Sequence, residues 1–478
     1  MQDHLNRLNN IGLTTRAGER FVPSQLVVIG FGMVARTMLT LMMKMNSQLL
    51  TLPILIVEPK RFSSVQPNKT RDENECLVKC KYEKNNDEHE PETIESEILE
   101  RLLNWNQKVT ILNIALTEEN YKDVFDNYVR ENAIVVELAV RLGTSSLIEE
   151  CQRKHCLYVN TSIDTWKYGE ESLFKVKQSI LNDVQYKKGE RKMTAACNHG
   201  MNPGLVSHFV KHLLNHLVTK SYDQELIEWK RKGKYNLIAQ KLGLTLIQIA
   251  ERDTQTTRFL SSEKCFFNTW SVVGLIDEAT METEISWGTH EEEMPYAASR
   301  REKRASGQII LPVPAYQVRT RSFEPKGGMF TGYCIPHAEA YSIAKLLRVG
   351  TNYIPSVYYS YLLPDTAKLI THYLDYALNN EYLPKREHVL RSDEIVDGYD
   401  SVGVLVFFRE GKELKKYWVG SIVNNETAKS ISPEINCTCM QVGISLIACI
   451  EWMMQNPDHQ TYVNCNHQTN KWAISFNG

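Results

Sequence analysis

The first block of the sequence that could do chemistry is a glycine turn near the start of the chain. Gly30-Phe31-Gly32-Met33-Val34-Ala35 has the pattern G-x-G-x-x-A and directly follows the apolar run "LVVI". The first glycine permits a tight turn, the second lets the backbone approach a pyrophosphate, and the following helix start supplies partial positive charge. The block therefore predicts a dinucleotide-binding turn, with a merely structural glycine turn as the alternative.

A carboxylate follows at a position suited to the adenosine ribose. The apolar run of residues 52–59 contains Glu58 near its end, where the side chain can accept hydrogen bonds from both ribose hydroxyls. The same carboxylate would repel a 2′-phosphate, so we expect NAD rather than NADP as the cofactor. Glu58 stands somewhat beyond the usual offset of about 20 residues from the glycine turn.

The stretch "AACNHGMNPG", residues 195–204, is the next candidate. Polar and glycine-rich residues stand here just before the apolar-periodic segment "GLVSHFVKHLLNHLV". Asn202 fits the N-cap of a helix and Pro203 fits its first position, where the missing N–H donor costs nothing. A helix start explains these residues without a ligand, and a ligand that docks at the helix start is the other interpretation.

The elements that must position these residues alternate in type along the first third of the chain. Residues 25–43 are predicted to form a strand, a glycine turn and a helix, and residues 52–59, 109–116 and 133–140 are predicted as further buried strands. Strands that alternate with helices indicate a Rossmann-like, doubly wound α/β sheet. We expect this NAD-binding domain to span residues 1–165.

A second, mixed α+β domain for substrate and dimerisation is expected over residues 166–435. Residues 243–255, 266–279 and 282–294 are predicted as sheet strands with polar and acidic residues at their ends. Residues 440–457 carry apolar residues at helical spacing. We expect this helix, within a C-terminal segment of residues 436–478, to pack back on the first domain.

Composition excludes several classes of partner. The 478 residues include 55 Lys and Arg against 57 Asp and Glu, so no global field favours nucleic acid or an anionic membrane. No apolar run reaches the ~18 residues of a membrane span and the start lacks a leader, so we expect a cytoplasmic protein.

The 11 cysteines form no Cys-x-x-Cys pair, so we expect no metal. The charged stretches 80–97, 187–192 and 299–306 are interpreted as surface segments.

Six blocks together carry a family resemblance. They are "NHGMNPGLVSHFVKHLL", "IAERDTQ", "NTWSVVGLIDEA", "WGTHEEEMP", "HAEAYSIA" and "DEIVDGYDSVGVL", in this order. In order and spacing they resemble bacterial homospermidine synthase, within the saccharopine dehydrogenase-like group, and the resemblance covers nearly the whole chain.

The resemblance implies a homodimeric, NAD-dependent aminobutyl transferase acting on putrescine and spermidine. In such an enzyme NAD is retained: it takes a hydride from one amine carbon, the resulting imine exchanges its nitrogen for the second diamine, and the hydride returns. Net redox is zero. The products are homospermidine and ammonia.

The resemblance also implies roles for individual residues. Putrescine is a dication, and burying an ammonium without a partner would cost several kcal/mol, so acids around its pocket are a physical requirement. An indole attracts a cation by ~0.5 to 2 kcal/mol. The catalytic residues implied are Glu251, Trp270, Glu278, Asn202 and His337, with His337 as a proton shuttle near neutral pH; the substrate-binding residues are Asp164, Glu339 and Asp400; and the cofactor-binding residues are Gly30, Phe31, Gly32, Met33, Val34, Glu58 and Thr117.

Two departures and several alternatives stay open. Asp164 stands where the family more often has Glu, and Val273 stands where a carboxylate is expected. Glu251 could instead pair with Arg252 or another surface base, and Trp270 could be ordinary core. Glu278 and Asp277 could be solvated charges of a loop, and His337 could cap a helix. At the level of function, one alternative is a saccharopine- or carboxyspermidine-type dehydrogenase, which needs an Arg clamp for a carboxylate; Arg252 is the one evident candidate for that clamp. The other is a catalytically silent NAD-binding scaffold.

Overall fold

The structure is a computed structural model, and it describes residues 21–59, 92–106, 108–166, 192–259, 265–300, 307–367, 370, 373–374, 386–459 and 461–463. The chain divides into two compact units. The first comprises Met1–Gly200, Ser430–Ile435 and Val442–Tyr462; the second comprises Met201–Lys429, Asn436–Gln441 and Val463–Gly478. The first unit thus continues to Gly200, whereas the sequence suggested a boundary near residue 165.

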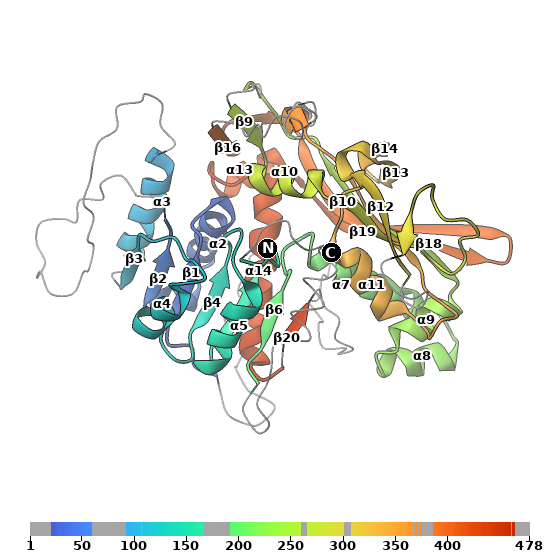
Figure 1. The fold of residues 1–478 in the computed structure, drawn as a ribbon, viewed down its shortest axis with the longest axis horizontal. Coiled ribbons are helices and arrows are strands. Elements are labelled where there is room, and N and C mark those ends of the chain that lie inside the picture. Colours follow the sequence, from blue (N-terminus) through green and yellow to red (C-terminus); the bar gives the residue numbers. More distant parts are fainter. Residues whose placement is uncertain are drawn as a thin grey trace, which may run out of the picture. The chain divides into compact units, whose positions relative to one another are not determined.

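The first unit contains a doubly wound parallel sheet, as predicted (Figure 1). Its strand order reverses between β1 and β4, which is where such sheets bind ligands. The strands, in spatial order, are β20 (Thr461–Val463), β6 (Ala195–Cys197), β5 (Leu157–Asn160), β4 (Ile134–Glu137), β1 (Leu26–Ile29), β2 (Ile54–Val57) and β3 (Val109–Leu112), with β1 to β6 all parallel.

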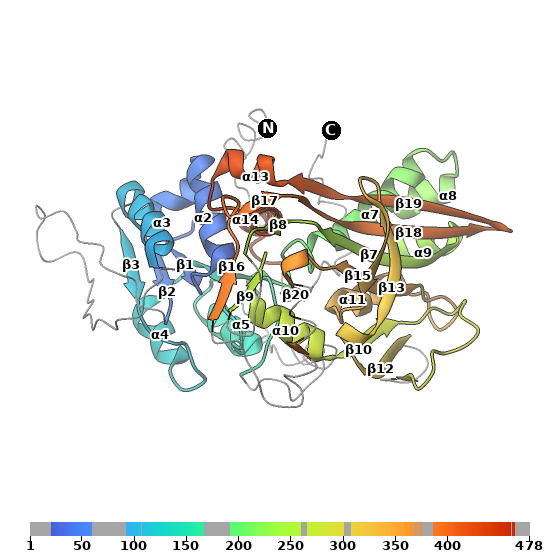
Figure 2. The same ribbon diagram turned by 90° about the horizontal axis from the view of Figure 1, so that it is seen from above.

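Helices cover both faces of this sheet, which explains why every residue of β1, β2, β4 and β5 is buried and most of these residues are apolar. Figure 2 shows α2 (Met33–Lys44) and α3 (Glu92–Trp105) over one face, and α4 (Tyr121–Tyr128) and α5 (Thr144–Arg153) over the other. A short 3-10 turn, η1 (Gln48–Thr51), leads into β2.

The predicted late helix is α14 (Cys437–Gln455), and its residues from Val442 onward belong to the first unit. It packs on α2, since a Cβ at Gly443 would lie 3.1 Å from side-chain atoms of both Leu41 and Thr37. Among the described residues, α14 is the one helix long and apolar enough to cross a membrane. Within its apolar 18-residue window, 72% is buried inside the protein, as expected for a core helix.

The second unit is built on a mixed nine-stranded sheet. Its main path is β11 (Ser299–Arg300), β12 (Gln308–Pro314), β10 (Glu282–Ser286), β15 (Ser356–Leu362), β7 (Leu244–Asp253), β18 (Tyr399–Glu410) and β19 (Glu413–Asn424), with β14 (Gly328–Tyr333) on β15 and β13 (Arg319–Glu324) on β14. In Figure 2, β15, β7, β18 and β19 lie side by side. The pair of β7 and β15 is parallel, and β7 and β18 are antiparallel.

Smaller elements surround this sheet. The helices are α7 (Leu205–Thr219), α8 (Gln224–Arg231), α9 (Tyr235–Lys241), α10 (Val272–Thr280), α11 (Ala338–Leu347), α13 (Asn425–Ile431) and the 3-10 turn η3 (Ala315–Gln317). Two small ladders pair β9 (Cys265–Asn268) with β16 (Arg386–Val389) and β8 (Thr256–Thr257) with β17 (Ile395–Asp397).

One predicted strand is wrong. Residues 266–279 were predicted as a strand, but only β9 is extended and the chain then forms α10. Ser271 caps this helix by accepting a 3.0 Å hydrogen bond from the Gly274 N–H. The buried residues Val272, Leu275, Ile276 and Ala279 recur at helical spacing, so the helix buries one apolar face. Glu278 therefore lies on a helix and does not follow a strand.

The helix start predicted at Asn202 is also wrong. Helix α7 begins at Leu205, and its N-cap residue is Gly204 with φ 129°, a conformation outside the helical region. Asn202 and Pro203 therefore lie in a turn before the helix. The Asn202 side chain is left available for another partner.

The charged stretches interpreted as surface segments fall largely on residues 80–91, 187–191 and 301–306, which lie outside the described residues.

Candidate active site

The glycine turn of the first unit has the geometry of a dinucleotide site. Gly30 has φ 86°, and a Cβ there would lie 2.7 Å from the Ala139 backbone nitrogen, so this position requires glycine. A Cβ at Gly32, by contrast, would meet nothing within 4 Å. Gly32 is the N-cap of α2, which has no side-chain cap and no acid in its first turn. These features fit an anion at the start of α2.

Glu58 lies beside this turn. Its Oε2 accepts a 2.7 Å hydrogen bond from the Phe31 N–H, and the residue is buried. Met33 and Val34 form the first turn of α2, and Thr117 lies in the loop after β3 with its N–H bound to Asn120 Oδ1 at 2.8 Å. The sequence-predicted cofactor residues thus follow the carboxyl ends of β1, β2 and β3, the edge where such sheets bind ligands.

In the second unit, three buried acids share one face of the sheet. Glu251 and Asp253 are two residues apart on β7, so both side chains leave the same face. Asp400 on β18 is paired with Asp253 in the ladder. The three residues are 5%, 1% and 0% exposed, respectively. The strand pairing therefore concentrates carboxyl groups that lie almost 150 residues apart in the sequence.

Two tyrosines of β15 join Glu251 to the indole. Tyr361 is paired with Glu251 in the parallel ladder, and Tyr359 donates its hydroxyl to Glu251 Oε2 at 2.7 Å. The two phenol rings stack with centroids 5.5 Å apart. Tyr361 in turn accepts the Trp270 indole N–H at 3.0 Å. Asn202 donates its amide to Glu251 Oε2 at 3.0 Å, which is the use its side chain has instead of capping α7.

A second group of charges surrounds His337. Its Nδ1 lies 3.2 Å from Glu339 Oε2, and its Nε2 lies 3.8 Å from Glu278 Oε1. The other oxygen of Glu339 accepts the Gly204 N–H at 2.6 Å, so this fully buried carboxylate connects α11 to the start of α7. Glu278 is the more exposed acid, with 27% of its side chain accessible. It is therefore the member of this group open to an incoming cation.

Burial shifts the pKa values of these groups. It raises the pKa of Glu251 to about 7, against the hydrogen bonds from Tyr359 and Asn202 that lower it. It raises the pKa of Asp253 to about 6. Burial, together with the charges of Glu251 and Asp253, raises the pKa of Asp400 well above its usual range. At neutral pH the three carboxyls therefore share protons and do not all carry charge.

The pKa of His337 is raised, whereas burial lowers the pKa of most histidines. Burial alone would lower its pKa, but the neighbouring carboxylates of Glu278 and Glu339 raise it to about 10. The imidazole is thus held as a cation at neutral pH. This differs from the sequence-based expectation of a shuttle that titrates near neutrality, because the flanking acids could not be placed from the sequence.

The structure gathers all five predicted catalytic residues in the second unit. Glu251, Asn202 and Trp270 are joined by hydrogen bonds and by the stacked rings of Tyr359 and Tyr361. His337, Glu278 and Glu339 form the group beside them. The ring of Tyr359 lies against the imidazole of His337 and so joins the two groups.

Asp164 belongs to the first unit, whereas the acid cluster belongs to the second, so the substrate-binding role of Asp164 stays a prediction. Its carboxylate accepts the N–H groups of Arg141 and Thr165 at 2.6 and 2.8 Å, which fix the local loop. Burial raises its pKa. Val273 lies on α10 and is half-buried.

Arg252 does not pair with Glu251. As the residue between Glu251 and Asp253 on β7, it leaves the opposite face of the sheet, where its Nη1 lies 3.3 Å from Glu324 Oε1. The one arginine that the sequence suggested as a clamp is therefore directed away from the acids.

Sequence reasoning missed Tyr359, Tyr361 and Asp253. A signal was present in "SVYYSYL", where the two tyrosines alternate and must share a face if the segment is a strand. Asp253 stands two residues after Glu251, with the same implication. Among the described residues, no group of three or more His, Cys, Asp or Glu side chains is arranged to hold a metal ion.

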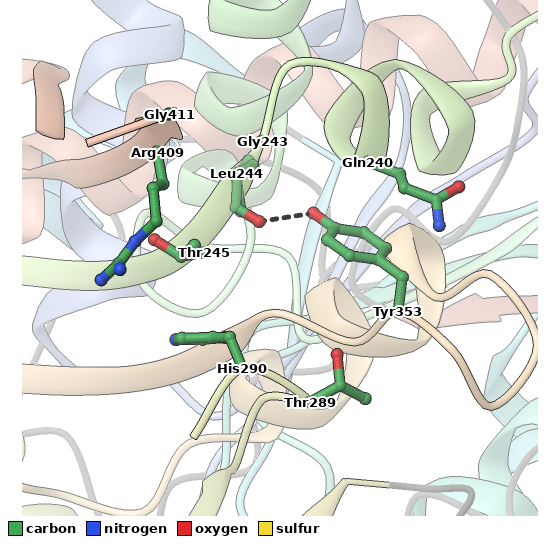
Figure 3. Close-up of a pocket in the computed structure, with 9 residues that line it drawn as sticks. All are labelled: Gln240, Gly243, Leu244, Thr245, Thr289, His290, Tyr353, Arg409 and Gly411. Carbon is green, nitrogen blue, oxygen red and sulfur yellow. Dashed lines mark hydrogen bonds between the residues drawn. The ribbon is translucent and has the colours of Figure 1, made fainter. Parts of the chain in front are cut away.

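A cavity of about 350 Å³ lies elsewhere in the second unit (Figure 3). Its lining includes Leu244 at the start of β7, and Tyr353 donates its hydroxyl to the Leu244 carbonyl at 2.8 Å. Glu251 lies seven residues further along β7 than Leu244, or roughly 23 Å at the usual rise per residue. The cavity is therefore not part of the acid cluster.

Comparison with known proteins identifies the family. Residues 26–196 match the saccharopine dehydrogenase NADP binding domain, and residues 200–442 match the saccharopine dehydrogenase C-terminal domain. The homospermidine synthase of Mesorhizobium japonicum is 31% identical over 73% of this chain and 74% of its own length, and that of Blastochloris viridis is 30% identical over 73% and 75%.

A solved structure extends the match. It is the homospermidine synthase of Legionella pneumophila in complex with NAD, with a TM-score of 0.75 and 26% identity over 94% of this chain and 87% of its own. The two unit folds, the glycine turn and the acid cluster are thus those of a chain that belongs to the homospermidine synthase family, within the saccharopine dehydrogenase group.

Proposed function

We propose that this chain is a homospermidine synthase that uses NAD to join two putrescine molecules, or putrescine and the aminobutyl group of spermidine. The observation that carries the proposal is the set of buried acids on one face of the second unit's sheet, linked through two tyrosines to the indole of Trp270. A diamine with a charge at each end needs such a pocket, because desolvating an ammonium without a counter-charge costs several kcal/mol.

Glu251 is suited to both binding and proton transfer. With a pKa of about 7 it exists in both protonation states near neutral pH, which is the condition for efficient general acid and base chemistry. Its hydrogen bonds to Tyr359 and Asn202 fix the carboxylate. We propose that ionised Glu251 binds an ammonium and accepts a proton when the amine must become a nucleophile.

The trio of His337, Glu278 and Glu339 would bind the second ammonium of the diamine. The imidazolium neutralises one of the flanking carboxylates, so the trio of His337, Glu278 and Glu339 carries about one net negative charge, enough to pair with one ammonium. Both oxygens of Glu339 are engaged in hydrogen bonds within the protein. Glu278 is thus the acid of this trio that we propose contacts the substrate.

Trp270 is half-buried and its indole N–H is fixed by Tyr361. Space beside the ring is kept open by Gly274, because a Cβ there would lie 2.9 Å from Trp270 Cζ3. A fixed indole can stabilise a cationic imine by about 1 to 2 kcal/mol where water is excluded. That is a factor of roughly 5 to 30 in rate.

The first unit would hold NAD. The open start of α2 and Gly32 would hold the pyrophosphate, and Glu58 would hold the adenosine ribose and disfavour a 2′-phosphate, although the matching family model is named for NADP. When bound, NAD supplies a reversible hydride acceptor. This chain's own residues would bind the diamine, move its protons and stabilise its cationic imine.

A net dehydrogenase of the same fold is the rival function. It would need a cationic clamp for the carboxylate of an amino-acid substrate, and the arginine that the sequence suggested is paired with Glu324 on the opposite face of the sheet. The acid cluster favours a substrate with amines and no carboxylate.

The test is incubation of the purified protein with putrescine and NAD, followed by mass spectrometry of the polyamines, an ammonia assay and the nicotinamide absorbance. We expect homospermidine and ammonia in equal amounts, without stoichiometric NADH. Steady NADH accumulation with an aldehyde product would establish the dehydrogenase instead. Unchanged putrescine in the presence of bound NAD would establish the silent scaffold.

Substitutions at Glu251 and Trp270 test whether the acid cluster and the indole carry out the reaction. Glu251→Gln is expected to lower turnover by about 10² or more, the usual loss for an acid or base group. Trp270→Ala is expected to slow turnover while NAD affinity stays unchanged. Trp418→Phe is a matched control, because Trp418 lies on β19 and packs in an apolar cluster with Ala250 and Leu405. Loss of NAD binding in Trp270→Ala would contradict the assigned role of the indole.

A further inference from the structure

We propose that Asp253 is a positioning residue: its carboxylate holds Thr269, and through Thr269 it fixes the indole of Trp270 relative to Glu251. The inference rests on the proposed function, because the indole and Glu251 are assigned to the diamine there. It adds two residues, Asp253 and Thr269, that would act on the reaction without touching the substrate.

The oxygens of Asp253 are occupied by the protein. The Thr269 hydroxyl donates to Oδ2 at 2.6 Å, and the Gln255 N–H donates to Oδ1 at 2.9 Å. The Gln255 side-chain amide lies 3.1 Å from both oxygens, and the Thr438 hydroxyl lies 3.4 Å from Oδ2. Four groups therefore converge on one carboxylate that is 1% exposed. Asp253 is saturated and has no lone pair to offer to a diamine.

Its neighbour in the ladder is different. Asp400 Oδ2 accepts the Gln441 amide at 3.0 Å, and the Thr438 hydroxyl also interacts with this carboxyl group. The buried Oδ1 has no hydrogen-bond partner within the described residues. The two aspartates are adjacent and equally buried, but only Asp253 has both oxygens engaged by hydrogen bonds within the protein. This contrast distinguishes Asp253, as a positioning acid, from Asp400, which keeps an oxygen available to bind a ligand.

Thr269 is the anchor of the corner that carries Trp270. The corner joins β9 to α10. The Thr269 hydroxyl is tied to Asp253 on β7, and its carbonyl accepts the Asn436 side-chain amide at 2.7 Å. Thr269 itself is fully buried. The residue before the indole is thus fixed on two sides.

These contacts close a ring. It runs from Glu251 through Tyr359 and Tyr361 to the Trp270 indole, on to Thr269 and Asp253, and back along β7 to Glu251. Without the bond from Thr269 to Asp253, the indole would be held to the sheet through the Tyr361 hydroxyl at its ring nitrogen. The ring therefore fixes both the position and the tilt of the indole.

The first test is Thr269→Val, which keeps the side-chain shape and removes only the donor. We expect kcat for putrescine to fall about tenfold, the worth of a hydrogen bond to a charged acceptor, with KM changed less than about twofold. The split arises because the carboxylates still bind the ground-state dication, whereas the indole acts on the later cationic imine. Thr269→Ser restores the donor and is expected to recover most of kcat.

The matched control is Thr283→Val. Thr283 is also fully buried in the second unit, on β10, and its hydroxyl donates to the Cys334 carbonyl at 3.4 Å. We expect wild-type kcat from this variant. An equal loss of kcat in Thr283→Val and Thr269→Val would show a general effect of buried threonines and overturn the inference.

A double variant separates positioning from a merely structural role. If Thr269 acts through the indole, Thr269→Val should cause no further loss of kcat in a Trp270→Phe background. A full additional tenfold loss there would overturn the inference. Thr269→Ala lacks the same donor and allows the same comparison if the valine variant does not fold.

A spectroscopic measurement is independent of turnover. Fluorescence quenching of Trp270 by acrylamide is obtained as the difference between each protein and its Trp270→Phe partner. We expect greater quenching in Thr269→Val and wild-type quenching in Thr269→Ser and Thr283→Val. If wild-type protein makes no homospermidine, the proposed function fails and this measurement alone decides the positioning role. If wild-type protein is active and Thr269→Val matches it in kcat and quenching, only the positioning role fails.

Discussion

The imidazole of His337 lies against the phenol ring of Tyr359, with the ring centroids 4.7 Å apart. Tyr359 donates its hydroxyl to Glu251, and His337 stands between Glu278 and Glu339. This contact joins the group that is cationic at neutral pH to the acid that titrates near neutral pH. The charge of the cluster is therefore expected to depend on pH in ways that single substitutions can resolve.

Tyr359→Phe should move the pH profile. Glu251 has a pKa of about 7, so kcat/KM for putrescine should rise as pH increases through that value and the carboxylate ionises. The Tyr359 hydrogen bond stabilises the ionised form, so its loss raises the pKa. The acidic limb should shift to higher pH by roughly half to one unit. Tyr361→Phe is the control, because that hydroxyl bonds Trp270; a limb that stays in place in Tyr359→Phe would contradict the assignment to Glu251.

His337→Gln should destabilise the protein in a pH-dependent way. The folded-state pKa of His337 is about 10, above the usual value of 6.5. The charged form is therefore favoured by folding, and this stabilisation is complete below about pH 6.5 and lost as pH rises through about 10. Thermal unfolding should show the largest difference from wild type near pH 6 and a smaller one near pH 10. A difference that grows with pH would be the contrary result.

Alanine substitutions of the two glycines in the dinucleotide turn should have different effects, one on stability and the other on NAD affinity. Gly30→Ala forces a side chain into φ 86° and against the Ala139 backbone, so we expect a loss of about 1 to 3 kcal/mol in stability. Gly32→Ala meets no atom within 4 Å, so its melting temperature should equal that of wild type while NAD affinity falls. Calorimetry and titration with NAD check both. Wild-type NAD affinity in a folded Gly32→Ala protein would place the pyrophosphate elsewhere.

Glu137→Gln should relieve a buried charge in the first unit. Glu137 ends β4, is 2% exposed, and accepts hydrogen bonds from the Tyr158 hydroxyl at 3.1 Å and the Asn160 amide at 3.2 Å. Burial outweighs these bonds and raises its pKa from 4.5 to about 8. Because the folded state holds the proton more tightly, wild-type stability should fall as pH rises from about 4.5 to 8.

The glutamine variant carries no such proton and lacks this slope, so its stability relative to wild type should increase over that range, by at most ~1.4 kcal/mol per pH unit. Unfolding by denaturant at several pH values measures the slope. Parallel pH profiles for the two proteins would show that Glu137 ionises normally.

The sequence allowed the first sheet to be predicted because its signals are local. The run "LVVI", the two glycines and the helix that follows lie within 20 residues, and each was found as predicted. In contrast, α10 was read as a strand because its apolar residues are dense, and the cap at Ser271 was not recognised. Asn202 has the right residue type for a cap, but the φ of Gly204 delays the helix.

The candidate site shows the same division. Glu251, Trp270 and His337 were identified through blocks that resemble a family. The contact between Glu251 and Tyr359 joins residues 108 positions apart and depends on how β7 and β15 pair, which neither segment specifies alone. The pKa of His337 likewise depends on the convergence of α10 and α11.

The pairing of β15, β7 and β18 has a consequence for substrate length. Tyr361, Glu251 and Asp400 come from three hydrogen-bonded neighbours, so their separations across the sheet are multiples of the ~4.8 Å interstrand spacing. Side-chain substitutions cannot change this interstrand spacing without breaking the hydrogen bonds between the strands. Redesign toward a longer or shorter diamine should therefore begin at α10 and α11, whose side chains can change size while the strands keep their spacing.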